Sequence, residues 1–207
     1  MAHIDPLPPD ETPELADEFE MFEEILGFVP NSLLTMQRKP AIVRGFRDLT
    51  QAVMRDANDV DPGFKRLAAH MASHAAGCQY CEAHSLIAAN LHGVSQEKVD
   101  DLWTYADSDL YTEKERVALD FALAAGSVPN DVDEEIMAAM RAHWSDDEIV
   151  ELLGAISLYG FLNRWNDSMA TTLEEPAIEV GERAIADRGW DGGKHRSGDG
   201  EHRADGA

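Results

Sequence analysis

Apolar residues recur along the chain at the three- and four-residue spacing of amphipathic helices. Two such series are Val99, Leu102, Trp103 and Ala106, and Val117, Phe121 and Leu123. No segment alternates apolar and polar residues with the period of two that is typical of a half-buried strand. The pattern therefore predicts an all-α chain of about seven or eight helices.

Residues that favour helix N-termini precede several of these apolar runs. Thr112 and Ser145 are each followed three residues later by a glutamate, which is the spacing of a capping box. A proline comes directly after Thr12 and after Asp61, and Pro40 opens a further apolar run. Because proline is favoured in the first turn of a helix, these five positions predict helix starts.

Residues 149–165 (IVELLGAISLYGFLNRW) differ from the amphipathic segments because they are apolar on nearly every side. A helix of this kind is buried on most sides, in the centre of a domain or at a subunit interface. One small domain has little interior for such a helix, so we expect a homo-oligomer. The polar end of the segment, residues 163–167, either caps the helix or binds a partner group.

The length of 207 residues and the 44% hydrophobic content suit one domain with a sizeable core. We expect this single helical domain to cover residues 21–186, after an N-terminal extension of residues 1–20. Residues 187–207 are rich in glycine and charge. Such a composition predicts a disordered tail, unless a neighbouring subunit holds it.

The charge balance restricts the possible partners. Asp and Glu number 40 and Lys and Arg 17, which gives a formal net charge of -23. This excess disfavours nucleic acid and anionic membranes as partners. The longest apolar run, residues 152–162, is shorter than the roughly 20 residues that a bilayer span needs. The N-terminus lacks the features of a signal peptide, so the expected location is cytoplasmic.

The two cysteines, Cys78 and Cys81, are three residues apart. A disulfide between them would close too short a loop to stabilise the fold much, so the pair indicates chemistry. Gly77 and the helical run that follows predict that Cys78 lies near a helix N-terminus, where backbone N–H groups lower a thiol pKa. His84 follows Cys81 by three residues and is expected on the same helix face.

A thiolate, a second thiol and an imidazole are the minimum parts of a dithiol peroxidase. In this interpretation Cys81 attacks the peroxide, Cys78 resolves the sulfenic acid, and His84 handles the proton. The helix N-terminus favours the opposite order of the two cysteines, and both orders stay open. No cofactor is expected.

A metal site is an alternative interpretation of the same segment. Its candidate ligands are His70, His74, Cys78, Cys81 and His84. They crowd onto two consecutive helical runs, whereas structural zinc sites usually draw ligand pairs from two separate loops. We therefore expect no metal, although a non-enzymatic redox or metal sensor remains a second hypothesis.

Four segments carry a resemblance to a known family. They are residues 27–31 (GFVPN), 77–84 (GCQYCEAH), 93–95 (GVS) and 161–167 (FLNRWND). The chain resembles carboxymuconolactone decarboxylase-like proteins, in the branch related to alkylhydroperoxidase D and the peroxidase-related proteins, over roughly residues 20 to 175. The resemblance implies an oligomeric all-helical fold and a peroxiredoxin-like peroxidase. Its substrate would be hydrogen peroxide or an organic hydroperoxide, and a thiol or dithiol reductant would recycle it.

Two positions depart from the alkylhydroperoxidase D pattern. The pattern has a glutamate twelve residues before the first cysteine and a histidine four residues after the second, and this chain has Arg66 and Ser85 there. His84 is one position early, about 100° around a helix. His70, one turn after Arg66, is therefore a second candidate for the proton relay.

The candidate substrate-binding residues are Arg66, Tyr80 and Arg164. A third hypothesis is a decarboxylase or isomerase-like enzyme acting on an acidic ring compound, in which Arg66, His70 and Arg164 bind carboxylates. The family's decarboxylase generally lacks the cysteine pair, which makes this hypothesis weaker than the peroxidase.

Overall fold

The computed structural model describes residues 2–57 and 59–197, and within them it is all-α. Ten α-helices run in the order α1 (Ala16–Leu26), α2 (Asn31–Met36), α3 (Pro40–Thr50), α4 (Pro62–Ala75), α5 (Gln79–Leu91), α6 (Gln96–Asp100), α7 (Glu113–Gly126), α8 (Glu134–His143), α9 (Asp146–Met169) and α10 (Glu175–Ala184). Eight of these have seven residues or more, which confirms the expected number. Short 3₁₀ turns precede α1, follow α10 and separate α6 from α7, and one π turn, Gln51–Asp56, follows α3.

The predicted helix starts are confirmed at four of five positions. Thr112 and Ser145 form complete capping boxes with the glutamates three residues later. Asp61 caps α4 by accepting the Phe64 N–H at 2.8 Å, and Pro40 is the first residue of α3. Thr12 makes no side-chain cap, because a 3₁₀ turn follows it and α1 begins later, at Ala16.

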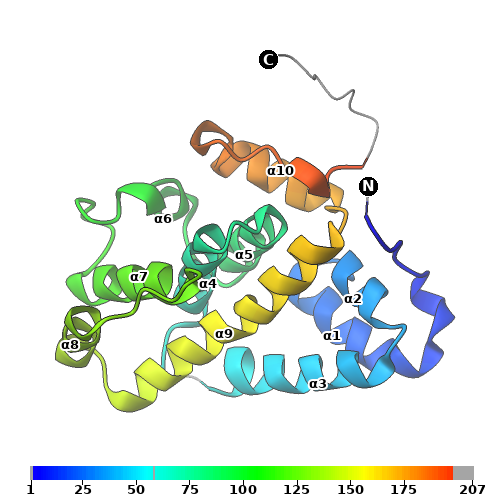
Figure 1. The fold of residues 1–207 in the computed structure, drawn as a ribbon, viewed down its shortest axis with the longest axis horizontal. Helices are drawn as coiled ribbons and strands as arrows, with labels where there is room; N and C mark the ends of the chain where they lie inside the picture. Colours follow the sequence, from blue (N-terminus) through cyan, green and yellow to red (C-terminus); the bar gives the residue numbers. More distant parts are fainter. Residues whose placement is uncertain (1, 58, 198–207) are drawn as a thin grey trace.

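Helix α9 crosses the middle of the molecule, and α4, α5 and α7 pack against it (Figure 1). Helices α1, α2 and α3 lie towards one end of the view, and α7 and α8 lie towards the other (Figure 1). The hairpin of α4 and α5 sits between these groups and contacts α9. In the turn that joins its two helices, Ala76 and Gly77 are exposed and Cys78 is buried.

A buried ion pair fixes α4 to α9. Lys65 is fully buried, and its Nζ lies 2.7 Å from Oε1 of Glu151. The same ammonium donates to the carbonyls of Val53 and Ala57, at 3.0 and 2.7 Å. Each donor of this buried cation thus has a partner, as burial of a charge requires.

Helix α9 is less enclosed than its sequence predicted. One face is buried in the core, but Val150 is 70% exposed and Phe161 is 40% exposed. A nearly all-apolar segment has no polar side to mark which face is open, so the pattern could not show this. The homo-oligomer stays a prediction, now attached to this exposed apolar face.

The tail is ordered further than predicted. Trp190 is buried over Gly181 and donates its indole N–H to the Gln79 carbonyl at 2.9 Å, and His195 is buried against the Thr171 carbonyl. These two aromatic side chains hold residues 187–197 against the domain, and the expected domain bounds stay a prediction. The rest of the predicted tail, residues 198–207, lies outside the described residues. The boundary expected at residue 21 falls within α1.

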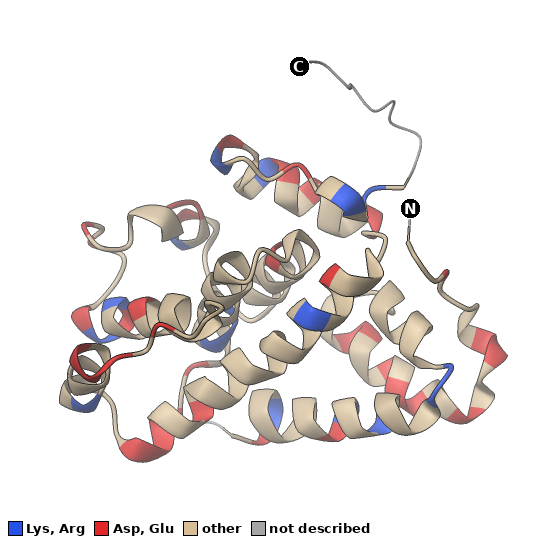
Figure 2. Ribbon diagram, viewed as in Figure 1, with Lys and Arg blue, Asp and Glu red and all other residues tan. Residues whose placement is uncertain are grey.

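Acidic side chains are spread over most helices, and they are dense on α1 and at the start of α9 (Figure 2). None of the helices in the described part of the chain combines the length and the apolar character that crossing a bilayer demands.

Candidate functional site

The turn between α4 and α5 places the two cysteines. Gly77 adopts a positive φ of 73°, a left-handed conformation that favours glycine, and Cys78 then caps α5. The Cys78 sulfur accepts the backbone N–H of Cys81 at 3.4 Å. The predicted position of Cys78 at a helix N-terminus is therefore confirmed.

The sulfurs of Cys78 and Cys81 are 2.8 Å apart, and both residues are buried. Cys81 lines a cavity of about 70 Å³, which Cys78 does not line. A disulfide has an S–S distance of about 2.05 Å, so a small movement of either side chain can join the pair. The arrangement presents one sulfur to a ligand and holds the second directly behind it.

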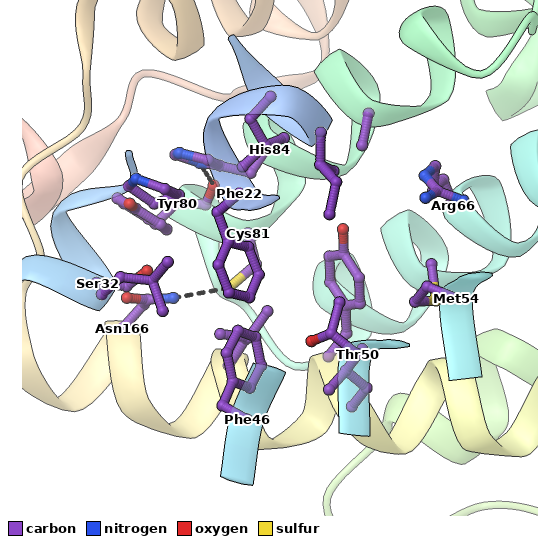
Figure 3. Close-up of a pocket in the computed structure, with 18 residues that line it drawn as sticks. Phe22, Ser32, Phe46, Thr50, Met54, Arg66, Tyr80, Cys81, His84 and Asn166 are labelled. Atoms are coloured by element: carbon purple, nitrogen blue, oxygen red, sulfur yellow. Dashed lines mark hydrogen bonds between the residues drawn. The ribbon is translucent and has the colours of Figure 1, made fainter. Parts of the chain in front are cut away.

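The cavity is strongly apolar and lies among α1, α3, α5 and α9 (Figure 3). Its apolar walls include Phe22, Leu33, Phe46, Met54, Leu158 and Leu162. Its few polar groups come from residues such as Arg66, Tyr80, His84 and Asn166. Concave, mostly apolar sites with few placed polar groups are typical of small-molecule binding.

Cys81 needs a partner to lose its proton. Burial raises the pKa of the Cys81 thiol well above its usual value, and the neighbouring Cys78 sulfur raises it further. The Asn166 amide acts in the opposite direction, because it donates to the Cys81 sulfur at 3.6 Å (Figure 3). At neutral pH the resting Cys81 is therefore a thiol, and a base must act before it can attack.

Both ring nitrogens of His84 have polar partners in the structure. It lies one turn after Cys81 on α5, and its Nδ1 is 2.8 Å from the Tyr80 carbonyl. A carbonyl only accepts, so Nδ1 carries a hydrogen. The other nitrogen, Nε2, lies 2.8 Å from Oε2 of Glu174. The Glu174 carboxylate therefore faces the ring nitrogen that the Tyr80 carbonyl does not contact.

Glu174 is the residue of this site that the sequence did not reveal. Its Oε1 accepts the Tyr80 hydroxyl at 2.9 Å and the Asn31 backbone N–H at 2.5 Å. Burial raises its pKa, but His84 and the Asn31 N–H outweigh this and keep the pKa below the usual value. Glu174 precedes α10, more than 90 residues after the cysteines, and no spacing rule links it to them.

Tyr80 joins this group through its ring as well as its hydroxyl. Its ring stacks on that of His84 with centroids 4.0 Å apart. Burial raises the pKa of Tyr80 well above its usual value, and the adjacent Glu174 carboxylate adds to the effect. Tyr80 is therefore a neutral donor that orients Glu174.

His70 and Ser85 form a separate pair on the far side of α5. Nδ1 of His70 is 3.1 Å from the Ser85 hydroxyl, which itself donates to the Glu82 carbonyl. Burial lowers the pKa of His70, which therefore stays neutral around pH 7. Neither residue lines the cavity that Cys81 faces, whereas His84 does.

The structure brings together most of the predicted site. Arg66, Tyr80, Cys81 and His84 line one cavity, and Cys78 lies behind Cys81. Arg164 is exposed and lines a different groove, together with Asn163 and Asp167 among others. Within the described part of the chain, no three His, Cys, Asp or Glu side chains are grouped as a metal ion requires.

Comparison with known proteins shows one family profile and one curated relative that match this chain. The profile of the carboxymuconolactone decarboxylase family matches residues 40–124. Over 116 residues the chain is 28% identical to the protein YnjA of Escherichia coli, and the match covers 56% of this chain and 63% of YnjA. The chain thus spans less than two thirds of the length of this curated relative.

Two solved structures of the debrominase Bmp8 are similar over nearly the whole domain. A cysteine-to-alanine variant in complex with 2,3,4-tribromopyrrole is 30% identical, with a TM-score of 0.84, covering 89% of this chain and 98% of that one. The unliganded enzyme is 32% identical, with a TM-score of 0.82, over 86% and 95% of the two chains.

A peroxidase-related protein from Ralstonia eutropha, with an alkylhydroperoxidase core, is 22% identical at a TM-score of 0.72. That match covers 89% of this chain and all of the other, and it establishes a shared fold.

Proposed function

Because this chain belongs to the carboxymuconolactone decarboxylase family, we propose that its cysteine pair makes it a dithiol peroxidase of the alkylhydroperoxidase type. One observation carries the proposal: Cys81 faces an apolar cavity, with the Cys78 sulfur 2.8 Å behind it. This chemistry needs two thiols. One must reach the substrate, and the other needs to reach only the first thiol.

The reaction proceeds in two steps. The Cys81 thiolate attacks the outer peroxide oxygen, the O–O bond breaks, and the alcohol leaves with one proton while the sulfur becomes a sulfenic acid. The Cys78 thiol then displaces the hydroxyl, which leaves as water, and a Cys78–Cys81 disulfide forms. An external thiol or dithiol returns the two electrons by exchange with this disulfide.

His84 and Glu174 supply the proton transfers. Burial makes the Cys81 thiol a weak acid, so its proton needs an acceptor close by. The alkoxide that leaves needs a donor, and His84, which lines the cavity and is paired with Glu174, is positioned to return a proton to it. The Asn166 amide stabilises the thiolate during the attack.

The walls of the cavity favour organic hydroperoxides over hydrogen peroxide. Aromatic and aliphatic side chains such as Phe22, Phe46 and Leu158 gain from covering an apolar substrate. Hydrogen peroxide has no apolar surface to bury, so we expect a lower apparent affinity for it.

Stopped-flow consumption of cumene hydroperoxide by the reduced protein tests this function. We expect the wild type to lose about 2 Da as the disulfide forms, and Cys78→Ser to gain about 16 Da as trapped sulfenic acid. Cys81→Ser should lose the reaction altogether. Full activity in Cys81→Ser with none in Cys78→Ser would reverse the two roles, and activity in both variants would reject the dithiol mechanism.

Reductive debromination is a second candidate function, favoured by the similarity to Bmp8 over nearly the whole of both chains and by the apolar cavity. The balanced step would be attack of the Cys81 sulfur on a ring bromine, with a proton delivered to the ring carbon. Cys78 would then displace bromide and form the disulfide. One bromide released per disulfide from a brominated pyrrole, without peroxide turnover, would favour this candidate.

A further inference from the structure

Arg66 differs from every other group in the cavity because it brings a buried positive charge. It is 2% exposed, and it lies in the first turn and a half of α4. Its Nη1 donates to the Pro62 carbonyl at 2.6 Å. Among the described residues, no carboxylate lies within the 4.0 Å of an ion pair from its guanidinium.

The adjacent residue, Lys65, shows how a buried cation with a purely structural role is paired in this fold. Lys65 is equally buried, and Glu151 and two backbone carbonyls satisfy it. Arg66 has one carbonyl partner, and the nearby Asp61 carboxylate is already used to cap α4. Burial lowers the pKa of Arg66, which is the effect of a charge held without a matching partner.

A second unsatisfied donor lies beside Arg66. Tyr159 of α9 lines the same cavity, and its hydroxyl makes no hydrogen bond within the described part of the chain. Burial raises the pKa of Tyr159 to about 12, so the hydroxyl keeps its hydrogen and can donate it. Tyr159 interacts electrostatically with both Arg66 and Cys81, and all three residues line the same cavity.

We propose that Arg66 and Tyr159 form an anion-binding subsite at one end of the cavity, and that the substrate is a small apolar molecule bearing a carboxylate. Figure 3 shows Arg66 on the Met54 side of the cavity, apart from Cys81. A ligand would place its carboxylate on the guanidinium and its reactive atom at the sulfur. The planar guanidinium matches a carboxylate better than it matches a neutral acceptor.

The net charge of the chain supports a dedicated cation at this position. A protein with a formal charge of -23 repels anions at long range, so an anionic substrate needs local compensation. This inference rests on the proposed function only in taking the Cys81 cavity as the substrate site.

Binding of a matched pair of probes tests the subsite without any turnover. Isothermal titration of the reduced full-length protein would compare para-bromobenzoate with para-bromobenzamide, which have similar shape and differ in charge. We expect the carboxylate to bind about tenfold tighter or more. Equal binding of the two probes, tighter binding of the amide, or binding of neither at millimolar concentration would overturn the proposal.

Variants then show which residues cause the preference for the carboxylate probe. Arg66→Met should remove it, Tyr159→Phe should reduce it, and Arg66→Lys should retain part of it. Arg164→Met removes an exposed arginine from a different groove and serves as the matched control, with no expected change. If Arg66→Met does not fold, Arg66→Lys and Tyr159→Phe still decide, because an unchanged preference in both would reject the subsite.

The outcomes also separate this inference from the proposed function. A carboxylate preference in a protein that consumes no hydroperoxide would support the subsite and reject the peroxidase. Hydroperoxide consumption without any preference between the probes would support the peroxidase and reject the subsite.

Discussion

At the scale of single residues, the protonation of Cys81 decides what the site can do. A buried thiol with a raised pKa is a poor nucleophile, so the proton acceptor limits the rate of attack. The structure offers His84 beside the cavity and His70 outside it. Substitutions of these two histidines are therefore expected to change the rate differently.

We predict that His84→Ala slows hydroperoxide consumption by about 10²- to 10⁴-fold, the usual contribution of a positioned acid or base. Stopped-flow rates at a fixed pH measure this effect. Ser85→Ala is the control and should change little, since Ser85 does not line the cavity. A large loss in His70→Ala with none in His84→Ala would show that the relay base is His70.

Glu174→Gln should reduce the rate by roughly tenfold to a hundredfold, because it removes a charge-assisted contact to His84. The amide keeps an oxygen for the Tyr80 hydroxyl and the Asn31 N–H, so the fold should be retained. Glu175→Gln is the matched control, since Glu175 is exposed at the start of α10. Equal rates in the two variants would remove Glu174 from the mechanism.

Much of this site was predictable from local sequence. Helical spacing placed His84 on the face of Cys81, and Gly77 placed Cys78 at a helix N-terminus, because both relations span only a few residues. Glu174 and Tyr159 were missed because they are far from the cysteines in the sequence. Tyr159 lines the cavity from α9, and Glu174 contacts His84 from the position before α10. The contact of Asn166 with Cys81 decides between two functions that the sequence left open for residues 163–167.

At the scale of elements, α4 and α7 meet through a glycine. An added Cβ on Gly126 would lie 2.5 Å from the Ala72 carbonyl oxygen and 2.6 Å from its Cα. Both are backbone atoms, so the clash is relieved only by moving one helix. The absence of a side chain at Gly126 thus lets the end of α7 approach α4 closely.

We predict that Gly126→Ala destabilises the protein by about 1–3 kcal/mol, the usual effect of overpacking a core. Gly45→Ala is the matched control, because Gly45 lies in α3 with no atom within 4 Å of the added Cβ. That change should instead stabilise by about 0.5–1 kcal/mol, since alanine favours a helix. Urea denaturation at fixed salt measures both. Destabilisation of the same size in the two variants would mean that the contact with Ala72 is not the cause.

Element boundaries were predicted best where capping chemistry is local. The capping boxes at Thr112 and Ser145 fixed two helix starts correctly, because their hydrogen bonds lie within four residues. Composition averages over residues 187–207 and cannot show the contacts that single residues make there. Two aromatic residues in that stretch, Trp190 and His195, have buried partners far away in the sequence.

At the scale of the whole molecule, the exposed apolar face of α9 is the clearest feature without a function. Val150, Leu153 and Phe161 are exposed along one helix. We predict a homo-oligomer that covers this face, and light scattering at micromolar concentration should give a mass above the 22.8 kDa of one chain. Phe161→Glu should shift the mass towards that of one chain, and a wild type that is already monomeric would reject the prediction.

Acidification acts on the whole molecule in two opposing ways. Protonating surface carboxylates relieves the repulsion that comes from a net charge of -23, which stabilises the fold. Burial lowers the pKa of His70 and of His195 below 6.5, so both are neutral when folded. Unfolding lets them bind protons, so their contribution to stability is present above about pH 6.5 and is lost as the pH falls through the folded values.

Salt separates these two effects. At about 1 M salt the Debye length is about 3 Å, so surface repulsion is largely screened while buried groups are much less affected. We therefore predict that, in high salt, the free energy of unfolding falls between about pH 7.5 and 5.5. His195→Asn keeps a donor for the Thr171 carbonyl but cannot titrate, and it should reduce the fall. His143→Asn, in the last turn of α8 and exposed, is the control and should leave the slope unchanged. Urea denaturation at both pH values gives the slopes, and equal slopes in wild type and His195→Asn would show that burial of His195 does not govern the acid response.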